Sequence, residues 1–142
     1  MRNRSRAFLA AVLFAWLMPA IAALPPQTYI AKAQQAPDAV RLKVMSVDRR
    51  VAGRVTEITL QGEVIEVRRS ESGLTPRDRI EIRYSIVQRP PDVVGPGQPG
   101  IPAEGEVVCA FLHHVAGTTH YSPAAGGATF SEWVWNASVE TP

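Results

Sequence analysis

The sequence predicts an all-β protein, a small closed barrel of about five strands. Apolar and polar residues alternate along several segments, and this period of two is typical of strands with one buried face. In two segments the alternation changes phase, which requires a bulge or a sharp bend, and long bent strands suit a closed barrel better than a flat sheet. No segment after residue 22 shows a convincing helical period.

Two long, curved strands are expected at residues 40–47 and 54–69. In the first, the apolar side chains move from one parity to the other after Val44. In the second, the phase changes after Val64, two residues beyond Gly62. A glycine inside a strand is a common place for a bulge, so we expect both strands to bend near these positions.

A turn at residues 71–78 leads into the segment with the clearest alternation, residues 79–86. The side chains expected to face inward there are Ile80, Ile82, Tyr84 and Ile86. Pro76-Arg77 stands at the centre of the turn. Because a residue other than glycine disfavours positive φ, we expect a type I turn rather than a type II turn.

The segment Val107–Leu112 is apolar on both parities, so both faces of this expected strand must be covered. Residues 133–135, Trp-Val-Trp, are the expected cover for its outer face. Cys109 lies inside the apolar run and is therefore expected to be a buried, inert thiol. A single cysteine cannot form an internal disulfide, so the apolar core alone is expected to hold the fold.

Residues 1–22 are expected to be a cleavable signal peptide. Arginines at positions 2, 4 and 6 precede an uncharged apolar run over residues 7–18, and residues 20–22 supply the small-x-small cleavage pattern. A single-span membrane anchor is the competing interpretation. It needs about 20 apolar residues, whereas this run has 12 before Pro19. We therefore expect a periplasmic or secreted protein with no membrane span left after cleavage.

Three parts are expected after the signal peptide. Residues 23–38 lack periodicity and should form a flexible lead-in, residues 39–136 a single barrel domain, and residues 137–142 a C-terminal tail. The whole chain has 15 Lys and Arg against 13 Asp and Glu, but three of the arginines belong to the signal peptide. The remainder has a net charge of −1. Nucleic-acid binding needs an excess of basic residues, so we expect no nucleic-acid partner.

Three stretches of turn and strand motifs point to a known type of protein. They are residues 69–76 running into 80–84, residues 95–97 with Pro102 and Gly105 ahead of 110–112, and residues 121–127 followed by Phe130. Together they resemble a loose group of small exported bacterial proteins without assigned function. The wider layout, over roughly residues 40–131, is similar to the OB-type barrel of netrin-like and metalloproteinase-inhibitor domains. The resemblance implies a five-stranded OB-like barrel.

The same resemblance does not extend to inhibition. The animal inhibitors chelate the protease metal through an N-terminal cysteine and are stapled by disulfides, whereas this chain has one cysteine, at position 109. The inhibitory mechanism is therefore not carried over to this chain.

Two loops are the expected binding region. Arg89–Gly105 holds five prolines and four glycines, a density that predicts a long, semi-rigid loop, and residues 116–128 are expected to form a second shaped loop. Apolar loop residues that cannot pack locally often contact a partner, although these could instead fold down over the barrel end. The candidate contact positions are Val93, Val94, Gly95, Pro96, Ile101, Tyr121 and Pro123.

These loops predict a binding or accessory module that is not an enzyme and needs no cofactor. It would engage another envelope protein or a small ligand; the oligomeric state stays open. The alternative is a metal-binding or metal-delivery protein using His113, His114 and His120 as ligands for Zn or Cu. This alternative requires the strand to end near Leu112, because adjacent histidines within a strand point to opposite faces.

Enzymatic alternatives are less favoured. Cys109 and His113 would lie about 13 Å apart along one strand, beyond hydrogen-bond reach. Ser122 has a histidine nearby at position 120, but the nucleophile-elbow pattern Gly-x-Ser-x-Gly is absent from the sequence.

Overall fold

The computed structural model describes residues 26–92 and 97–138. The elements in chain order are helix α1 (Pro26–Gln35), strands β1 (Asp38–Ala52), β2 (Val55–Ser70), β3 (Arg79–Val87), β4 (Val107–His114) and β5 (His120–Pro123), the 3-10 helix η1 (Gly126–Ala128) and helix α2 (Glu132–Ala137). The strands close into a barrel in the order β1-β2-β3-β5-β4. Neighbouring strands are antiparallel except for the parallel pair β3–β5. The predicted all-β, five-stranded OB-like barrel is therefore confirmed.

The two predicted phase changes are real bulges in the β1–β2 ladder. Between the pairs Val44↔Gly62 and Ser46↔Gln61, Met45 has no partner opposite it. Between Arg41↔Glu66 and Leu42↔Val64, Ile65 is the extra residue. Each bulge turns the following apolar side chains to the other face and bends its strand around the barrel.

Gly62 has a packing role beside these bulges. A Cβ atom at this position would lie 2.8 Å from Cδ1 of Leu42, which is too close for any contact between carbon atoms. Glycine therefore leaves the space inside the barrel that the Leu42 side chain fills.

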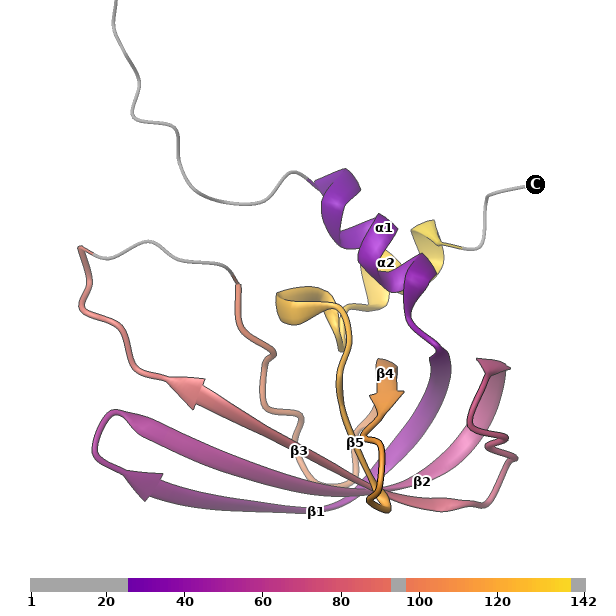
Figure 1. Cartoon of the computed structure of the whole chain (residues 1–142), viewed down its shortest axis with the longest axis horizontal. Coiled ribbons are helices and arrows are strands. Elements are labelled where there is room, and N and C mark those ends of the chain that lie inside the picture. Colours follow the sequence, from indigo (N-terminus) through magenta and orange to yellow (C-terminus); the bar gives the residue numbers. More distant parts are fainter. Residues whose placement is uncertain (1–25, 93–96, 139–142) are drawn as a thin grey trace, which may run out of the picture.

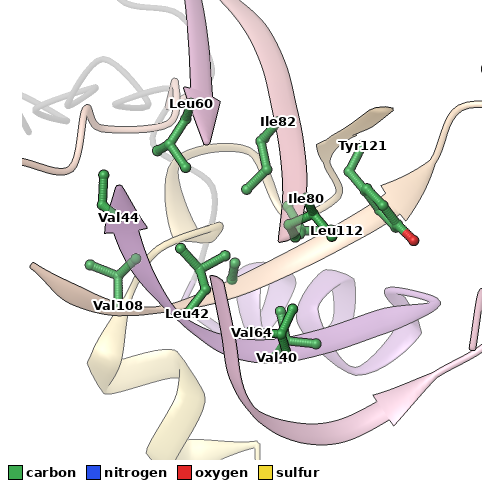
Figure 2. Close-up of a cluster of buried hydrophobic side chains, with 11 residues drawn as sticks. Val40, Leu42, Val44, Leu60, Val64, Ile80, Ile82, Val108, Leu112 and Tyr121 are labelled. Carbon is green, nitrogen blue, oxygen red and sulfur yellow. The ribbon is translucent and has the colours of Figure 1, made fainter. Parts of the chain in front are cut away.

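The barrel interior is filled mainly by branched aliphatic side chains from β1, β2, β3 and β4, together with one aromatic ring, that of Tyr121 on β5 (Figure 2). The buried members are Val40, Leu42, Val44, Leu60, Val64, Ile80, Ile82, Val108, Ala110, Leu112 and Tyr121. They follow the predicted period of two, including the inward-facing side of β3. Burial of apolar side chains of this kind is the main favourable contribution to folding.

A second apolar layer covers the outer face of β4. Figure 1 shows α1 and α2 together on one side of the strands. Their contact with the barrel is a cluster of Ala33, Ala36, Ala39, Cys109, Phe111, Ala125, Ala128, Val134 and Trp135. The rings of Phe111 and Trp135 lie 5.8 Å apart between centroids. Both faces of β4 are thus covered as predicted, but by Val134 and Trp135 and not by Trp133, which is 59% exposed.

Cys109 is the buried thiol that the sequence predicts. It has no exposed surface, and burial raises the pKa of its thiol to about 12. A thiol in this state carries almost no thiolate at neutral pH, so it is chemically inert.

The lead-in expected to be flexible is wrong for residues 26–35, which form α1. Helix α1 buries Ala33 and packs Tyr29 and Ile30 beside it on the outer apolar layer. Its C-terminal end is held by Arg69 of β2, whose Nε donates to the Ala36 carbonyl over 2.7 Å and whose Nη2 donates to the Ala33 carbonyl. A cation at a helix C-terminus satisfies free carbonyls and is favoured by the helix dipole.

Within the described residues, no helix is long and apolar enough to cross a membrane.

The turn before β3 also differs from the expectation. Arg77 has φ of +79°, and the Asp78 amide donates to the Thr75 carbonyl over 3.1 Å, which is the pattern of a type II turn rather than type I. The Arg77 amide donates to the Val64 carbonyl over 2.7 Å, and Asp78 accepts from the Thr75 amide through its side chain. These bonds hold Arg77 in a conformation that its side chain disfavours.

Candidate functional site

A groove of about 430 Å³ lies where α1, the loop after β3 and the η1–α2 segment meet. Its walls are Tyr29, Gly97, Gln98, Gly127, Ala128, Ser131, Trp133 and Val134. None of these residues carries a charge, and apolar and aromatic side chains line most of the surface. Grooves with such linings are the usual place for a ligand or a peptide.

Two glycines bring the walls of the groove together. A Cβ atom at Gly97 would lie 2.9 Å from the Tyr29 hydroxyl, and one at Gly127 would lie 3.2 Å from the backbone of Gly97. The loop therefore packs backbone against backbone on η1, and α1 approaches it through the ring of Tyr29. A side chain at Gly97 would displace the Tyr29 hydroxyl, and one at Gly127 would press against the backbone of Gly97.

The described part of the loop after β3 is fixed to the barrel. The side-chain amide of Gln98 acts as a strand partner for Val87: Nε2 donates to the Val87 carbonyl over 2.8 Å, and the Val87 amide donates to Oε1 over 2.7 Å. The Tyr84 hydroxyl donates to the Gly100 carbonyl over 2.7 Å. Burial raises the pKa of Tyr84 to about 12, which keeps this donor protonated. The groove wall at residues 97–100 is thus anchored at two points.

Helix α2 is also held in place, by a side-chain cap and by contacts from two arginines. Ser131 caps its N-terminus by accepting from the Val134 amide over 3.3 Å. Arg41 of β1 forms two hydrogen bonds to Glu132, at 2.8 and 3.1 Å, and these hydrogen bonds lower the pKa of Glu132. On the other side, the guanidinium carbon of Arg68 lies 3.6 Å from the centroid of the Trp135 ring. Successive helical residues point about 100° apart, so burying Trp135 and Val134 leaves Trp133 on the open side.

Two aromatic side chains border the groove with free polar atoms. Trp133 is 59% exposed and Tyr29 is half-buried. In the part of the chain that the structure describes, neither the indole N–H of Trp133 nor the hydroxyl of Tyr29 has a hydrogen-bond partner. A large exposed tryptophan beside an apolar groove is typical of a surface that contacts a partner.

The structure describes three of the seven predicted loop contacts. Residues 93–96, which comprise Val93, Val94, Gly95 and Pro96, lie outside the described residues. Ile101 and Pro123 are half-buried, and neither lines the groove. Tyr121 is wrong as an exposed contact, because it lies on β5 with 6% of its surface exposed and its hydroxyl 2.7 Å from Oγ of Ser72. Its ring closes the barrel interior.

The histidine alternative is contradicted by the geometry. Strand β4 continues through His114, so adjacent His113 and His114 point to opposite faces. His114 donates from Nε2 to the Thr118 carbonyl over 2.6 Å, and Nε2 of His113 lies 2.7 Å from Oγ of Ser122. Among the described residues, no three His, Cys, Asp or Glu side chains are placed to hold one metal ion.

His113 and Ser122 have the residue types of a hydrolytic dyad and lie within hydrogen-bond distance of each other. It is a cross-strand contact between directly opposite residues of β4 and β5. A catalytic histidine needs a third group that orients it, usually a carboxylate on its other nitrogen. The second nitrogen of His113, Nδ1, lies 3.3 Å from the same serine oxygen, and no described carboxylate contacts the ring. The pair therefore fits a polar strand contact.

A buried carboxylate at the start of β1 is a feature that sequence reasoning missed. Asp38 has no exposed surface, and its Oδ1 accepts hydrogen bonds from the hydroxyls of Ser70 and Ser72. Its Oδ2 has no partner among the described residues. The carboxylate ties the beginning of β1 to the end of β2 and, through Ser72, to the hydroxyl of Tyr121.

Sequence reasoning also missed most of the groove. Tyr29 lies in the segment expected to be a flexible lead-in, and Trp133 in the expected cover of β4. The one sequence feature that indicates part of the groove is the Pro/Gly-rich composition of residues 89–105, the loop that contains Gly97.

Comparison of the chain with protein-family models, with curated proteins and with solved structures finds no match. The resemblance to netrin-like domains therefore stays an expectation from the sequence.

Proposed function

We propose that this protein is a non-enzymatic binding module, and that its site is the groove between α1, residues 97–98 and the η1–α2 segment. The observation that carries the proposal is Trp133, a large aromatic side chain left 59% exposed beside a neutral, mostly apolar groove. Exposing it costs the favourable free energy of its burial, which binding of a partner restores.

The construction of the groove supports the same role. Each wall is anchored to the barrel: α1 through Arg69, the loop through Gln98, and α2 through Arg41 and Arg68. A site whose parts are already in place loses little conformational entropy when a ligand binds. The groove therefore suits recognition of one partner surface.

We place this function in the periplasm or outside the cell, because residues 1–22 have the pattern of a cleavable export signal. The partner is then another envelope protein or a small ligand of that compartment. Fractionation followed by N-terminal sequencing tests the location. Intact protein in the cytoplasm, still starting at Met1, would contradict it.

The groove itself is tested by capture of partners on two immobilised variants. Trp133→Ala removes the exposed aromatic side chain, and Val107→Ala is the matched control because Val107 is 48% exposed on β4 and does not line the groove. We expect an envelope protein to be retained by the wild type and by Val107→Ala but not by Trp133→Ala. Equal retention by all three proteins would contradict the proposal.

A further inference from the structure

We propose that the protein forms a two-fold symmetric dimer in which the free edge of β1, residues 47–51, pairs antiparallel with the same edge of a second copy. This inference is independent of the groove. Strand β4 pairs with β1 only along residues 38–43, and the backbone of Gly105 and Glu106 then bonds to Val44. Beyond that point β2 is the one described strand that pairs with β1. Figure 1 shows this half of the β1–β2 hairpin reaching beyond β4 and β5.

The backbone of this edge has free hydrogen-bonding groups. Along an edge strand, every second residue directs its amide and carbonyl away from the neighbouring strand. Val47 is one of them, because its amide donates to Oε1 of Glu104 over 3.3 Å and not to β2. The alternation therefore directs the amides of Arg49 and Val51, and the carbonyls of Val47, Arg49 and Val51, out of the sheet edge. No described residue bonds to these five groups, and such an edge is a template for another strand.

The charges of the edge select one register for two identical strands. Residues with outward backbone groups must meet each other, so Val47, Arg49 and Val51 of one copy face the same three residues of the other. A two-fold axis on Val47 or Val51 would run half of the edge against the bulge or the turn. An axis on Asp48 or Arg50 would place like charges opposite each other, which destabilises a strand pair. The axis therefore lies on Arg49.

In this register the two edges are complementary. Asp48 of each copy lies opposite Arg50 of the other, which gives two ion pairs on one face of the joined sheet. Within the described chain, neither side chain has an ion pair. On the other face Val47 lies opposite Val51, whose side chain is 72% exposed in the single copy. Two backbone hydrogen bonds join the Arg49 residues, and two more run from the Val51 amides to the Val47 carbonyls.

The two Arg49 side chains are compatible with an axis at this residue. Arg49 pairs with Ile58 of β2, and Ile58 pairs with Tyr84 of β3, so the three side chains share one face of the sheet. The charge of Arg49 acts on the Tyr84 hydroxyl and opposes the rise in its pKa that burial causes. The Arg49 side chain therefore extends over its own sheet, which separates the two guanidinium groups across the axis.

Protection of the edge is the alternative explanation for its charged residues. Native proteins place charges on free edges, because repulsion there prevents pairing between copies. Repulsion would have to act in the register that the backbone allows, whereas Asp48 and Arg50 attract each other in that register. The edge is short, so the dimer belongs to the class of weak, reversible interfaces and forms only in concentrated solution.

Sedimentation of the protein as isolated from cells, at chain concentrations up to the millimolar range, tests the dimer and its register. We expect a reversible equilibrium between monomer and dimer. Asp48→Arg and Arg50→Asp each create two like-charge pairs and should weaken the dimer by about tenfold or more. The double variant Asp48→Arg/Arg50→Asp restores opposite charges and should restore the dimer. Glu71→Arg, at an exposed turn position after β2, is the control for the change in net charge.

A single cysteine locates the axis. Arg49→Cys places two thiols opposite each other, on Cα atoms about 5.5 Å apart, which is within the range of a disulfide. Val51→Cys is the matched control on the same face, because its two copies would lie four residues apart, about 13 Å along the strands. Mild oxidation should give a disulfide-linked dimer from Arg49→Cys and little from Val51→Cys. The native Cys109 has no exposed surface and does not take part.

The outcomes decide between this dimer and other occupants of the edge. A protein that sediments as a monomer at every concentration would overturn the inference. A double charge variant no better than the single variants, or equal cross-linking at positions 49 and 51, would do the same. If the protein is monomeric and Asp48→Arg instead abolishes capture of another envelope protein, the edge binds a foreign strand and the dimer is wrong. None of these variants changes a residue of the groove, so the proposed function is tested separately.

Discussion

The two apolar layers of this molecule are built in different ways. The barrel interior consists mainly of branched aliphatic side chains from four of the five strands, such as Leu42, Leu60 and Ile82, which have no exposed surface, and β5 adds the ring of Tyr121. The outer layer under α1 and α2 is largely built from alanines, with Phe111 and Trp135 as its large members. Polar contacts from three arginines, one of them an ion pair with Glu132, reinforce this outer layer.

The difference separates stability from function. Small side chains bury little apolar surface, so the outer layer contributes less to folding than the interior does. Beside this layer, Gly97 and Gly127 let the loop after β3 approach α1 and η1 closely, and this close approach forms the groove. Substitutions in the interior should therefore affect the whole fold, whereas substitutions in the outer layer should affect binding and, more weakly, stability.

The largest effect is expected in the interior. Leu60→Ala leaves a cavity at a position with no exposed surface and should lower the free energy of unfolding by about 2–5 kcal/mol. Urea unfolding followed by circular dichroism measures this change. The control is Met45→Ala at the exposed bulge, which should change stability by no more than about 0.5 kcal/mol. Equal effects would mean that the interior is not the main source of stability.

A smaller effect is expected for the anchors of the outer layer. Arg68→Ala removes the stacking on Trp135 and the hydrogen bonds to the Trp135 carbonyl and the Ser138 hydroxyl. We expect a loss of about 1–2 kcal/mol in the free energy of unfolding. The same urea experiment checks it, with the exposed residue Arg50→Ala as control. No difference between the two variants would show that the stacking contact is not stabilising.

The barrel could be predicted from the sequence because its signal is local. A period of two identifies the strands, and a change of phase identifies the bulges at Met45 and Ile65. The turn type could not be predicted in this way, because the conformation of Arg77 is enforced by a hydrogen bond to the distant Val64 carbonyl. Local preference was overridden by a tertiary contact.

Helix α1 and the groove could not be predicted from the sequence, because they too depend on contacts between distant residues. The C-terminal end of α1 is capped by Arg69, which lies more than 30 positions later in the chain. The groove combines Tyr29, Gly97, Gly127 and Trp133, which are residues from four separate segments. No spacing in the sequence links them, since they meet only after the barrel has placed the segments.

A still smaller effect is expected from the ion pair of Arg41 with Glu132. The hydrogen bonds from Arg41 lower the pKa of Glu132, so the unfolded chain takes up a proton more readily than the folded protein does. The stabilisation is therefore present above the ordinary glutamate pKa of about 4.3 and is lost as the pH falls through the lower folded value.

Because Glu132 is largely exposed, the pair should contribute at most about 1 kcal/mol. Glu132→Gln should be less stable than the wild type at pH 7, and the difference should shrink as the pH falls below 4. Urea unfolding at a series of pH values measures it, with exposed Glu57→Gln as control. A difference that grows towards low pH would contradict this assignment.

At Cys109 the expected effect is on chemical reactivity. Its thiol has no exposed surface and a pKa of about 12. A thiol reagent such as dithionitrobenzoate should therefore react only after denaturant is added, with one equivalent per chain. Fast labelling of the native protein would show that the outer layer opens over β4.

The central claim is that the outer layer carries a binding groove marked by Trp133. The most direct test places the photo-cross-linking amino acid p-benzoylphenylalanine at position 133 in living cells, with position 107 on β4 as the control. The account predicts a discrete cross-linked product from position 133 and none from position 107. Absence of any product at 133, or equal products at both positions, would contradict it.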